Sequence, residues 1–349
     1  MKKPFDIHQF IRPNVMSMKP YASARDEFKD HQADLVFLDA NENPYDTGYN
    51  RYPDPQQIAL KSRIAEIKNV PVNNVFLGNG SDEVLDLIFR AFCEPQKDEV
   101  MILPPTYGMY EVLANLNAIQ ILKVDLDTDF QPNVDAILKQ QSSSTKILFL
   151  CAPNNPTGNS IDEDKIEKLL HGFNGLVVID EAYIDFTTKD SWSVRLQEFP
   201  NLIITQTLSK AYGLAGIRLG ICYASEAIIR ILNRIKPPYN VNMLTQEKAL
   251  EDLKQTALID EKITKIIAQR RWLVSELENI SFIEKVFPSE ANFLLVKVDN
   301  ADKRYDQLIN KGIVIRNRTN QPNCYNCLRF TIGTPMDNIK LLSALKQIS

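Results

Sequence analysis

The run KILFLC at residues 146–151 is the first of four short, almost entirely apolar segments in the middle of the chain. The others are LVVID at 176–180, LIIT at 202–205 and LGICY at 219–223. Apolar runs of this length favour strands that are buried on both faces. Helical patterns lie between some of them, for example at 162–170. This alternation predicts an α/β fold with a mostly parallel sheet that helices cover on both faces.

The pattern changes in the last third of the chain. A long helical stretch is predicted from about Thr245 to Leu277, and the strand-like runs NFLLVKV at 292–298 and RFTI at 329–332 follow it. Helices mixed with a few strands predict a smaller α+β domain. The first forty or so residues have no strand partner of their own, so we expect them to join that smaller domain.

Length and composition indicate a two-domain globular protein. The chain has 349 residues, more than one hydrophobic core usually organises, and its composition is ordinary, with 44% hydrophobic and 24% charged residues. We expect a large domain over residues 46–238 and a small domain that combines 1–45 with 239–349. A formal net charge of −4 provides no basic surface for nucleic acid, and no apolar run is long enough to span a membrane.

Cysteine and histidine usage predicts a cytoplasmic protein without a metal site. The first residues, MKKPFD, lack the apolar stretch of a secretory signal, and an odd number of cysteines, five, suggests free thiols in a reducing compartment. Cys324 and Cys327 form a single Cys-x-x-Cys pair, which is half of a zinc site, and we assign it no role. His8, His31 and His171 are isolated in the sequence, so neither a histidine-based triad nor a multi-histidine metal centre is expected.

A glycine-rich turn, GNGSDE at 78–83, follows the short apolar run at 75–77. A helical pattern begins within it, with apolar positions at Val84, Leu85, Ile88, Ala91 and Phe92. Such a turn points free backbone N–H groups and the positive end of the helix dipole outward, which suits a phosphate. A plain helix cap explains the same residues, so the turn alone is weak support for a binding site.

Three further polar elements follow predicted strands at their carboxyl ends, where ligands of open α/β sheets bind. They are APNNPTG at 152–158, DEAY at 180–183 and TLSK at 207–210. The first could be a simple turn. The carboxylate of Asp180 needs a cationic or N–H partner, because a buried carboxylate is otherwise poorly solvated.

Lys210 is the candidate nucleophile. A lysine after a strand is normally a solvated surface residue, but this one lies among apolar or small residues and precedes Arg218 by eight positions. Partial burial near another cation would lower the pKa of its amine and make that amine nucleophilic. Thr207, Ser209 and Arg218 are the donors that a phosphate would need.

Together these motifs resemble those of the fold-type I aminotransferases, most closely the histidinol-phosphate aminotransferases. The similarity runs from about Tyr21 to Thr334 and includes, in the order of the family, LDANENP at 38–44, RYP at 51–53, RAFCEP at 90–95, PPTYGMY at 104–110 and LRFTIGT at 328–334. The resemblance implies a large domain with a mostly parallel seven-stranded sheet flanked by helices, and pyridoxal 5'-phosphate as the cofactor. It also implies ping-pong transamination between L-histidinol phosphate and 2-oxoglutarate, giving imidazole-acetol phosphate and L-glutamate, in histidine biosynthesis.

The resemblance assigns cofactor-binding roles residue by residue. Lys210 holds the cofactor as a Schiff base and moves the proton between the substrate Cα and the cofactor, while Asp180 pairs with the pyridine nitrogen. Asn155 and Tyr183 match the donors to the ring 3'-oxygen, and Tyr107 matches the aromatic residue that stacks on the ring. The cofactor phosphate falls to Gly80, Ser81, Asp82, Thr207, Ser209 and Arg218, with Tyr52 reaching in from a partner subunit. This last role implies a homodimer with shared active sites.

Substrate binding falls to residues near both ends of the chain. Arg329 matches the arginine that grips the substrate α-carboxylate, with Asn155 beside it. Arg316 and Tyr21, together with Arg329, match the residues that hold the phosphate of histidinol phosphate. We further hypothesise that glutamate presents its side-chain carboxylate to Arg316.

Two other functions are compatible with parts of the pattern, and a third is not expected. An aromatic amino acid aminotransferase would use the same scaffold and cofactor motifs. A decarboxylase of a phosphorylated amino acid would share Lys210 and Asp180. The effector domain of a transcription regulator is not expected, because the family motif begins near Tyr21 and leaves no room for a preceding helix-turn-helix.

Overall fold

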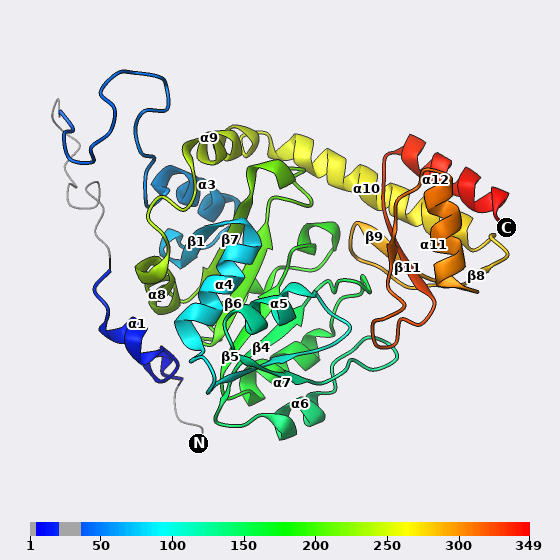
Figure 1. The fold of residues 1–349 in the computed structure, drawn as a ribbon, viewed down its shortest axis with the longest axis horizontal. Helices are drawn as coiled ribbons and strands as arrows, with labels where there is room; N and C mark the ends of the chain where they lie inside the picture. Colours follow the sequence, from blue (N-terminus) through cyan, green and yellow to red (C-terminus); the bar gives the residue numbers. More distant parts are fainter. Residues whose placement is uncertain (1–4, 21–35) are drawn as a thin grey trace. The chain divides into compact units, whose positions relative to one another are not determined.

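The structure is a computed structural model that describes residues 5–20 and 36–349 (Figure 1). The chain forms two compact units, one from Met1–Glu94 with Ser193–Thr256 and the other from Pro95–Trp192 with Ala257–Ser349. We call them the first unit and the second unit. The domain boundaries expected from the sequence stay a prediction.

The larger sheet has seven strands, hydrogen-bonded in the order β1-β7-β6-β5-β4-β2-β3. β2 is parallel to β3 and β4, and β4 is parallel to β5, whereas β7 is antiparallel to both β6 and β1. The four apolar runs from the middle of the sequence are β4 to β7, so the mostly parallel α/β fold is confirmed. The strands are β1 (Val75–Asn79), β2 (Glu99–Ile102), β3 (Gln120–Lys123), β4 (Thr145–Cys151), β5 (Leu176–Asp180), β6 (Leu202–Thr207) and β7 (Leu219–Ala224).

The first unit contains β1, β6 and β7 and the helix that follows the glycine-rich turn. That helix, α4, packs on β7, β1 and β6, and it buries the apolar positions expected from the sequence, including Val84, Leu85 and Ile88. The other helices are α1 (Pro13–Ser17), α3 (Ile58–Lys68), α8 (Glu226–Ile235) and α9 (Met243–Asp252), with α4 at Gly80–Phe92 and short 3-10 helices η1 (Ile7–Gln9), η2 (Val72–Asn74) and η5 (Ala215–Ile217). The 3-10 helix η4 (Trp192–Arg195) lies where the chain enters this unit.

The second unit contains the remaining strands of the large sheet and a second, smaller sheet. Its helices near the large sheet are α5 (Met109–Leu116), α6 (Val134–Gln140) and α7 (Glu163–Gly172), with the 3-10 helix η3 (Ile184–Phe186) after β5. The small sheet is antiparallel, in the order β10-β11-β9-β8. Its strands are β8 (Ile283–Val286), β9 (Phe293–Val298), β10 (Arg316–Asn317) and β11 (Cys327–Thr331).

Three helices share one hydrophobic core with the small sheet, and Figure 1 shows them beside it. They are α10 (Thr256–Leu277), α11 (Ala301–Asn310) and α12 (Pro335–Gln347). Fully buried members of this core include Leu277, Leu294 and Leu308. The helices and strands expected in the last third of the chain are therefore present.

One expected helix is wrong in its extent. The stretch from Thr245 to Leu277 forms two helices, α9 and α10, because the chain turns between Asp252 and Thr256. The carbonyl of Leu253, which would accept from the next helical turn, instead accepts two hydrogen bonds from the guanidinium of Arg63, at 2.9 and 3.2 Å. A contact between residues so far apart in sequence leaves no local signal.

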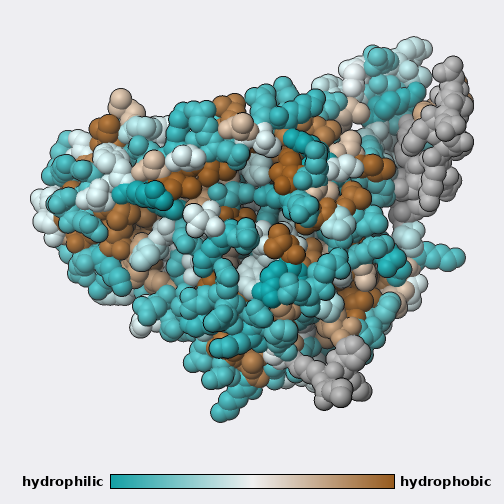
Figure 2. All heavy atoms as spheres, turned by 180° about the vertical axis from the view of Figure 1, so that it is seen from behind, coloured by the Kyte–Doolittle hydropathy of each residue, from teal (hydrophilic) through white to brown (hydrophobic). Residues whose placement is uncertain are grey.

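The surface seen in Figure 2 shows hydrophobic side chains as separate spots among hydrophilic ones. Isolated exposed apolar residues are normal for globular proteins. Among the described residues, no helix combines the length and the apolar character that crossing a lipid bilayer requires.

Lys61 on α3 is a buried cation that opposes folding. Its side chain is only 7% exposed, and burial, followed by the positive charge of Lys236, lowers its pKa to about 8 although Asp54 opposes the shift. Below pH 8 the amine is charged in both the folded and the unfolded chain, so the folded state bears the full cost. Between pH 8 and the ordinary lysine pKa of 10.5 the unfolded chain binds more protons, so this group adds stability as the pH rises.

We therefore expect Lys61→Met to stabilise the protein at pH 7 by about 1–3 kcal/mol in the free energy of unfolding, and by less at pH 9.5. Urea unfolding at the two pH values measures the difference. Lys262→Met, at an exposed position on α10, is the control and should show no such pH dependence. A variant that is less stable than the parent at pH 7 would show that the Lys61 amine makes a favourable contact.

Candidate active site

The first unit gathers the phosphate-type motifs at one edge of its strands. Because β7 is antiparallel to both neighbours, its first residues lie beside their last ones: Leu219 is opposite Asn79, and Gly220 is opposite Thr207. The residue before β7, Arg218, accepts a hydrogen bond of 2.8 Å at its carbonyl from the amide of Gly80. The glycine-rich turn, Thr207 and Arg218 are thus neighbours in space.

Two glycines allow this close approach. Gly80 has a φ of +76°, and a Cβ there would lie 2.6 Å from Nη2 of Arg218. A Cβ on Gly220 would lie 2.3 Å from the amide nitrogen of Ser81. The N-cap residue of α4, Asn79, makes no side-chain capping hydrogen bond. Backbone amides of the first helical turn, beginning at Ser81 and Asp82, therefore combine with the positive end of the helix dipole into a cradle for an anion.

Hydroxyl and cationic side chains surround this cradle. Arg218, itself in the left-handed conformation with φ +56°, places Nη2 3.6 Å from a carboxylate oxygen of Asp82, and both side chains are partly exposed. The hydroxyl of Thr207 lies 2.9 Å from that of Ser209 and accepts a hydrogen bond of 3.1 Å from the Ser209 amide. Lys210 follows directly. The partial burial expected for Lys210 is wrong, because its side chain lies in the turn after β6 and is exposed.

In the second unit, Asp180 ends β5 as a buried carboxylate, 3% exposed. The phenol of Tyr110 donates a hydrogen bond of 2.8 Å to its Oδ2, and the amide of Ala182 donates one of 3.2 Å to its Oδ1. Tyr110 is fully buried on α5 and stacks on Phe149 of β4, with ring centroids 4.8 Å apart. The partner that the sequence argument demanded for this carboxylate is therefore a tyrosine together with a backbone amide.

The side chains of Asn155, Tyr183 and Arg329 form a second polar group in this unit. Nη1 of Arg329 donates a hydrogen bond of 2.5 Å to Oδ1 of Asn155, and its guanidinium lies over the ring of Phe293. The ring of Tyr183 meets Phe293 edge-on, with centroids 5.2 Å apart. Burial raises the pKa of the Tyr183 phenol, and the positive charge of Arg329 opposes that shift. The phenol is consequently neutral and can donate a hydrogen bond at physiological pH.

Asn154, one residue before Asn155, joins the two loops that carry site residues in this unit. Its side-chain amide is 1% exposed and donates to the carbonyl of Pro105 at 2.8 Å and to the hydroxyl of Thr157 at 2.7 Å. Pro105 precedes Tyr107 by two residues. The position of the Tyr107 ring, which meets Tyr110 edge-on at 5.5 Å between centroids, is therefore tied to the position of Asn155.

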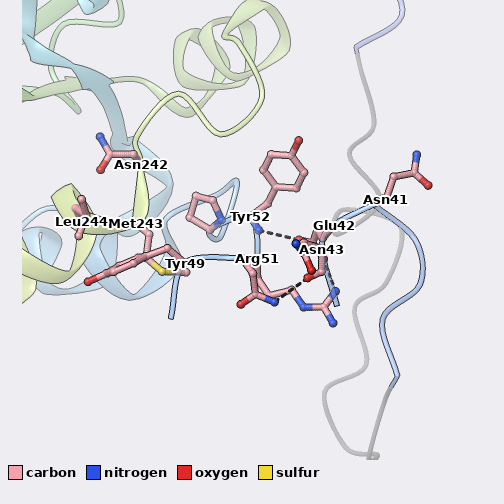
Figure 3. A pocket seen from close by; sticks show the side chains of 11 residues that line it. Asn41, Glu42, Asn43, Tyr49, Arg51, Tyr52, Asn242, Met243 and Leu244 are labelled. Atoms are coloured by element: carbon pink, nitrogen blue, oxygen red, sulfur yellow. Dashed lines mark hydrogen bonds and ion pairs between the residues drawn. The ribbon is translucent and has the colours of Figure 1, made fainter. Parts of the chain in front are cut away.

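Tyr52 lies on the surface of the first unit. Its ring is 51% exposed and stacks on Tyr239, with centroids 4.5 Å apart. It lines a pocket of about 550 Å³, together with Asn41, Glu42, Asn43, Tyr49, Asn50, Arg51, Pro53, Asn242, Met243 and Leu244. Figure 3 shows Glu42 bound to the guanidinium of Arg51 and to the amide of Tyr52, each at 2.7 Å. Tyr21 lies outside the described residues.

Sequence reasoning missed Tyr110 and Asn154. Tyr110 reads as one more apolar position of a short helix, three residues after the tyrosine that was selected. Asn154 reads as part of a turn. A signal existed for Tyr110, because a buried carboxylate at the end of β5 needs a donor from a neighbouring element.

We expect Tyr110→Phe to destabilise the protein by about 1.5–3 kcal/mol, the usual contribution of a hydrogen bond to a charged group. The substitution keeps the ring on Phe149 and removes one donor from Asp180. Urea unfolding of the variant gives the change in free energy. Tyr325→Phe, which removes the same atom from a ring that is 71% exposed, should change it by less than about 0.5 kcal/mol. Equal effects of the two substitutions would show that the Tyr110 phenol does not support Asp180.

A family model places this arrangement in a class of enzymes. The model of the family "Aminotransferase class I and II" matches residues 26–345. The chain therefore belongs to the class I and II aminotransferases, and it is an enzyme that depends on pyridoxal 5'-phosphate.

Individual relatives narrow the class. The histidinol-phosphate aminotransferase of Flavobacterium johnsoniae is 61% identical over 346 residues, which cover 99% of each chain. That of Christiangramia forsetii is 59% identical over 346 residues, again with 99% of each chain covered. The crystal structure of the histidinol-phosphate aminotransferase from Clostridium acetobutylicum is 27% identical, with a TM-score of 0.80 over 86% of this chain and 91% of that one. The resemblance to histidinol-phosphate aminotransferases and the fold-type I architecture are confirmed.

The residues present fit the cofactor of this class. The cradle at the start of α4, with Ser209 and Arg218 beside it, has the donors for a phosphate. Asp180 offers a buried carboxylate for a protonated ring nitrogen, and Asn155 and Tyr183 offer polar groups for a ring oxygen. These are the chemical demands of a phosphorylated pyridine aldehyde.

Proposed function

We propose that this enzyme transfers the amino group of L-histidinol phosphate to 2-oxoglutarate, giving imidazole-acetol phosphate and L-glutamate, in histidine biosynthesis. The observation that carries the proposal is the 61% identity to a histidinol-phosphate aminotransferase over 99% of both chains. The arginines of the small sheet support it, because both substrates are anions that need a cationic site.

When bound, pyridoxal 5'-phosphate supplies an aldehyde that accepts amino groups and a ring that withdraws electrons from the substrate Cα. Lys210 provides the amine that holds this aldehyde covalently. When that bond is released, the Lys210 amine would be free to take up the proton of the substrate Cα and to give it back. An exposed position after β6 suits both tasks, because the long side chain can move without disturbing the core.

Asp180 keeps the ring nitrogen protonated. Its carboxylate accepts hydrogen bonds from Tyr110 and from the amide of Ala182, and these hold it in place. Asn155 and the neutral phenol of Tyr183 would donate hydrogen bonds to the ring oxygen, and Tyr107 would stack on the ring. Offset stacking of this kind contributes about 0.5–1.5 kcal/mol.

The phosphate group of the cofactor would be held by the backbone amides of Ser81 and Asp82 and by the side chains of Thr207, Ser209 and Arg218. Gly80 would allow the close approach of Arg218, because its own amide donates to the Arg218 carbonyl. Tyr52 completes this set in a partner subunit. Its ring is 51% exposed and therefore accessible to a second chain, which supports that role. We therefore propose a homodimer with shared active sites, located in the cytoplasm. The five cysteines are free thiols, which suits a reducing compartment.

Arg329 binds the α-carboxylate of glutamate and, with Arg316 and Tyr21, the phosphate of histidinol phosphate. Arginine suits this position because its planar fork binds a carboxylate or a phosphate through two parallel hydrogen bonds. Arg316 lies directly opposite Arg329 in the small sheet, so one anionic group can contact both guanidinium groups.

A panel of amino donors, assayed with 2-oxoglutarate on the purified holoenzyme, tests the proposal. We expect kcat/KM for histidinol phosphate to exceed that for phenylalanine and for tyrosine. A preference for phenylalanine would assign the enzyme to aromatic amino acids instead. Release of carbon dioxide from phosphothreonine would identify a decarboxylase.

A further inference from the structure

Three arginines share one face of the strand pair β10–β11 in the second unit. Arg316 on β10 is directly opposite Arg329 on β11. The ladder continues for one residue, because the amide of Arg318 donates a hydrogen bond of 2.8 Å to the carbonyl of Cys327. Side chains alternate between the two faces of a strand, so Arg318 lies on the same face as Arg316. The side chain between them, Asn317, goes to the other face, where it donates a hydrogen bond of 2.6 Å to Asp302 of α11.

No carboxylate of the described chain neutralises this face. None of Arg316, Arg318 and Arg329 makes an ion pair there, and the side-chain partner of Arg329 is the neutral oxygen of Asn155. The Nε atoms of Arg318 and Arg329 are buried and have no hydrogen-bond acceptor. Burial lowers the pKa of both guanidinium groups, and the positive charges of their neighbours lower it further. Like charges that face one another across a strand pair destabilise it.

Arg318 was not selected from the sequence, and the resemblance gives it no role. It lies near the candidate site nevertheless. The charge of Tyr183 affects the pKa of Arg318, and the charge of Arg318 lowers the pKa of Arg329. A face that concentrates three cations and buries two unsatisfied donors is built to receive an anion with several acceptor oxygens. The two anions of the proposed reaction differ in this respect. A carboxylate has one negative charge and two oxygens, whereas a phosphomonoester has close to two charges and three free oxygens at pH 7.

We infer that Arg318 is a specificity-determining residue that selects the dianionic phosphate of the amino donor over a carboxylate. The inference rests on the proposed function for the identity of the donor. Arg316 and Arg329 are sufficient for the two carboxylates of glutamate, one guanidinium for each. The third guanidinium matches the additional charge and the additional oxygen of the phosphate.

The experiment compares the two half-reactions of the Arg318→Gln holoenzyme with those of the parent. The substitution should raise the KM for histidinol phosphate roughly tenfold and leave the KM for glutamate within about threefold, with kcat little changed, because a charged fork is lost in binding only. The KM for histidinol phosphate of the parent should also rise below about pH 6, where the phosphate takes up its second proton, and this rise should be smaller in the variant. Arg318→Lys should recover only part of the affinity.

Two binding readouts do not depend on turnover. Calorimetric titration of the holoenzyme with inorganic phosphate should show about tenfold weaker binding in Arg318→Gln. The melting temperature of the variant without phosphate should equal or exceed that of the parent, because a like charge has been removed. Arg271→Gln, which removes an exposed arginine from α10 in the same unit, is the control and should change neither quantity.

The outcomes separate this inference from the proposed function. If the parent enzyme does not accept histidinol phosphate, the proposed function is wrong. The titration with inorganic phosphate then still tests the role of Arg318. If the parent accepts the substrate and Arg318→Gln weakens both half-reactions equally, or neither, the selective role is overturned. A lowered melting temperature with unchanged KM values and unchanged phosphate binding would make Arg318 a structural residue.

Discussion

The Lys210→Ala variant should fold as the parent does and lose transamination by at least about a thousandfold, the range in which a positioned acid–base group contributes to a rate. The expected loss exceeds that lower bound, because the same amine also binds the cofactor covalently. The fold should be unaffected because the Lys210 side chain is exposed and lies beyond the last residue of β6. Steady-state turnover and a urea unfolding curve measure the two effects.

Trapping the parent holoenzyme with borohydride, followed by peptide mass spectrometry, should locate the cofactor on Lys210. Lys254→Ala, which removes another exposed lysine of the first unit, is the control and should keep both the adduct and the activity. An adduct on a different side chain of the parent, or full activity of Lys210→Ala, would contradict the role assigned to this amine.

Arg329→Lys should lower kcat/KM for both histidinol phosphate and glutamate by about 1.5–3 kcal/mol in transition-state binding, the usual contribution of one hydrogen bond to a charged group. This corresponds to roughly 10-fold to 150-fold. Lysine keeps the charge, but it cannot donate two parallel hydrogen bonds to a carboxylate and to Asn155 at once.

The two half-reactions, each followed by cofactor absorbance, measure this loss separately. An effect confined to one substrate would show that the two anions do not share Arg329. Arg304→Lys is an informative comparison, because Arg304 also donates two hydrogen bonds to one carboxylate, that of Asp299, but it belongs to α11, which contacts the other face of the strand pair β10–β11. It should lower stability and leave KM unchanged.

The large sheet could be predicted from the sequence because its strands are nearly continuous apolar runs. LVVID at 176–180 is β5 without any change of boundary, and KILFLC differs from β4 by one residue. The antiparallel direction of β7 could not be predicted, because strand direction leaves no trace in an apolar run of five residues. That direction brings Arg218 beside Gly80. The motifs therefore predicted which residues form the cradle, but not how they come together.

Candidate site residues could be predicted where a motif lies at the end of a predicted strand, as for Asp180 and Ser209. The structure adds residues whose roles depend on contacts between distant segments. Tyr110 reaches Asp180 across 70 positions of sequence, and Asn154 reaches Pro105 across 49. The exposure of Lys210 could not be predicted either. The residue follows a buried strand and has apolar neighbours in the sequence, but these neighbours do not cover its side chain in space.

Gly220 limits which substitutions this enzyme can accept near the anion cradle. Since not even a methyl group fits between β7 and the nitrogen of Ser81, the backbone of the anion cradle and the backbone of β7 are in direct contact at this point. The segments around Ser81 and Gly220, about 140 positions apart in the chain, can therefore accept substitutions at this contact only if both change together. If β7 moved away from the cradle, the cofactor would be bound less tightly. A phosphate bound in the cradle would in turn stabilise β7.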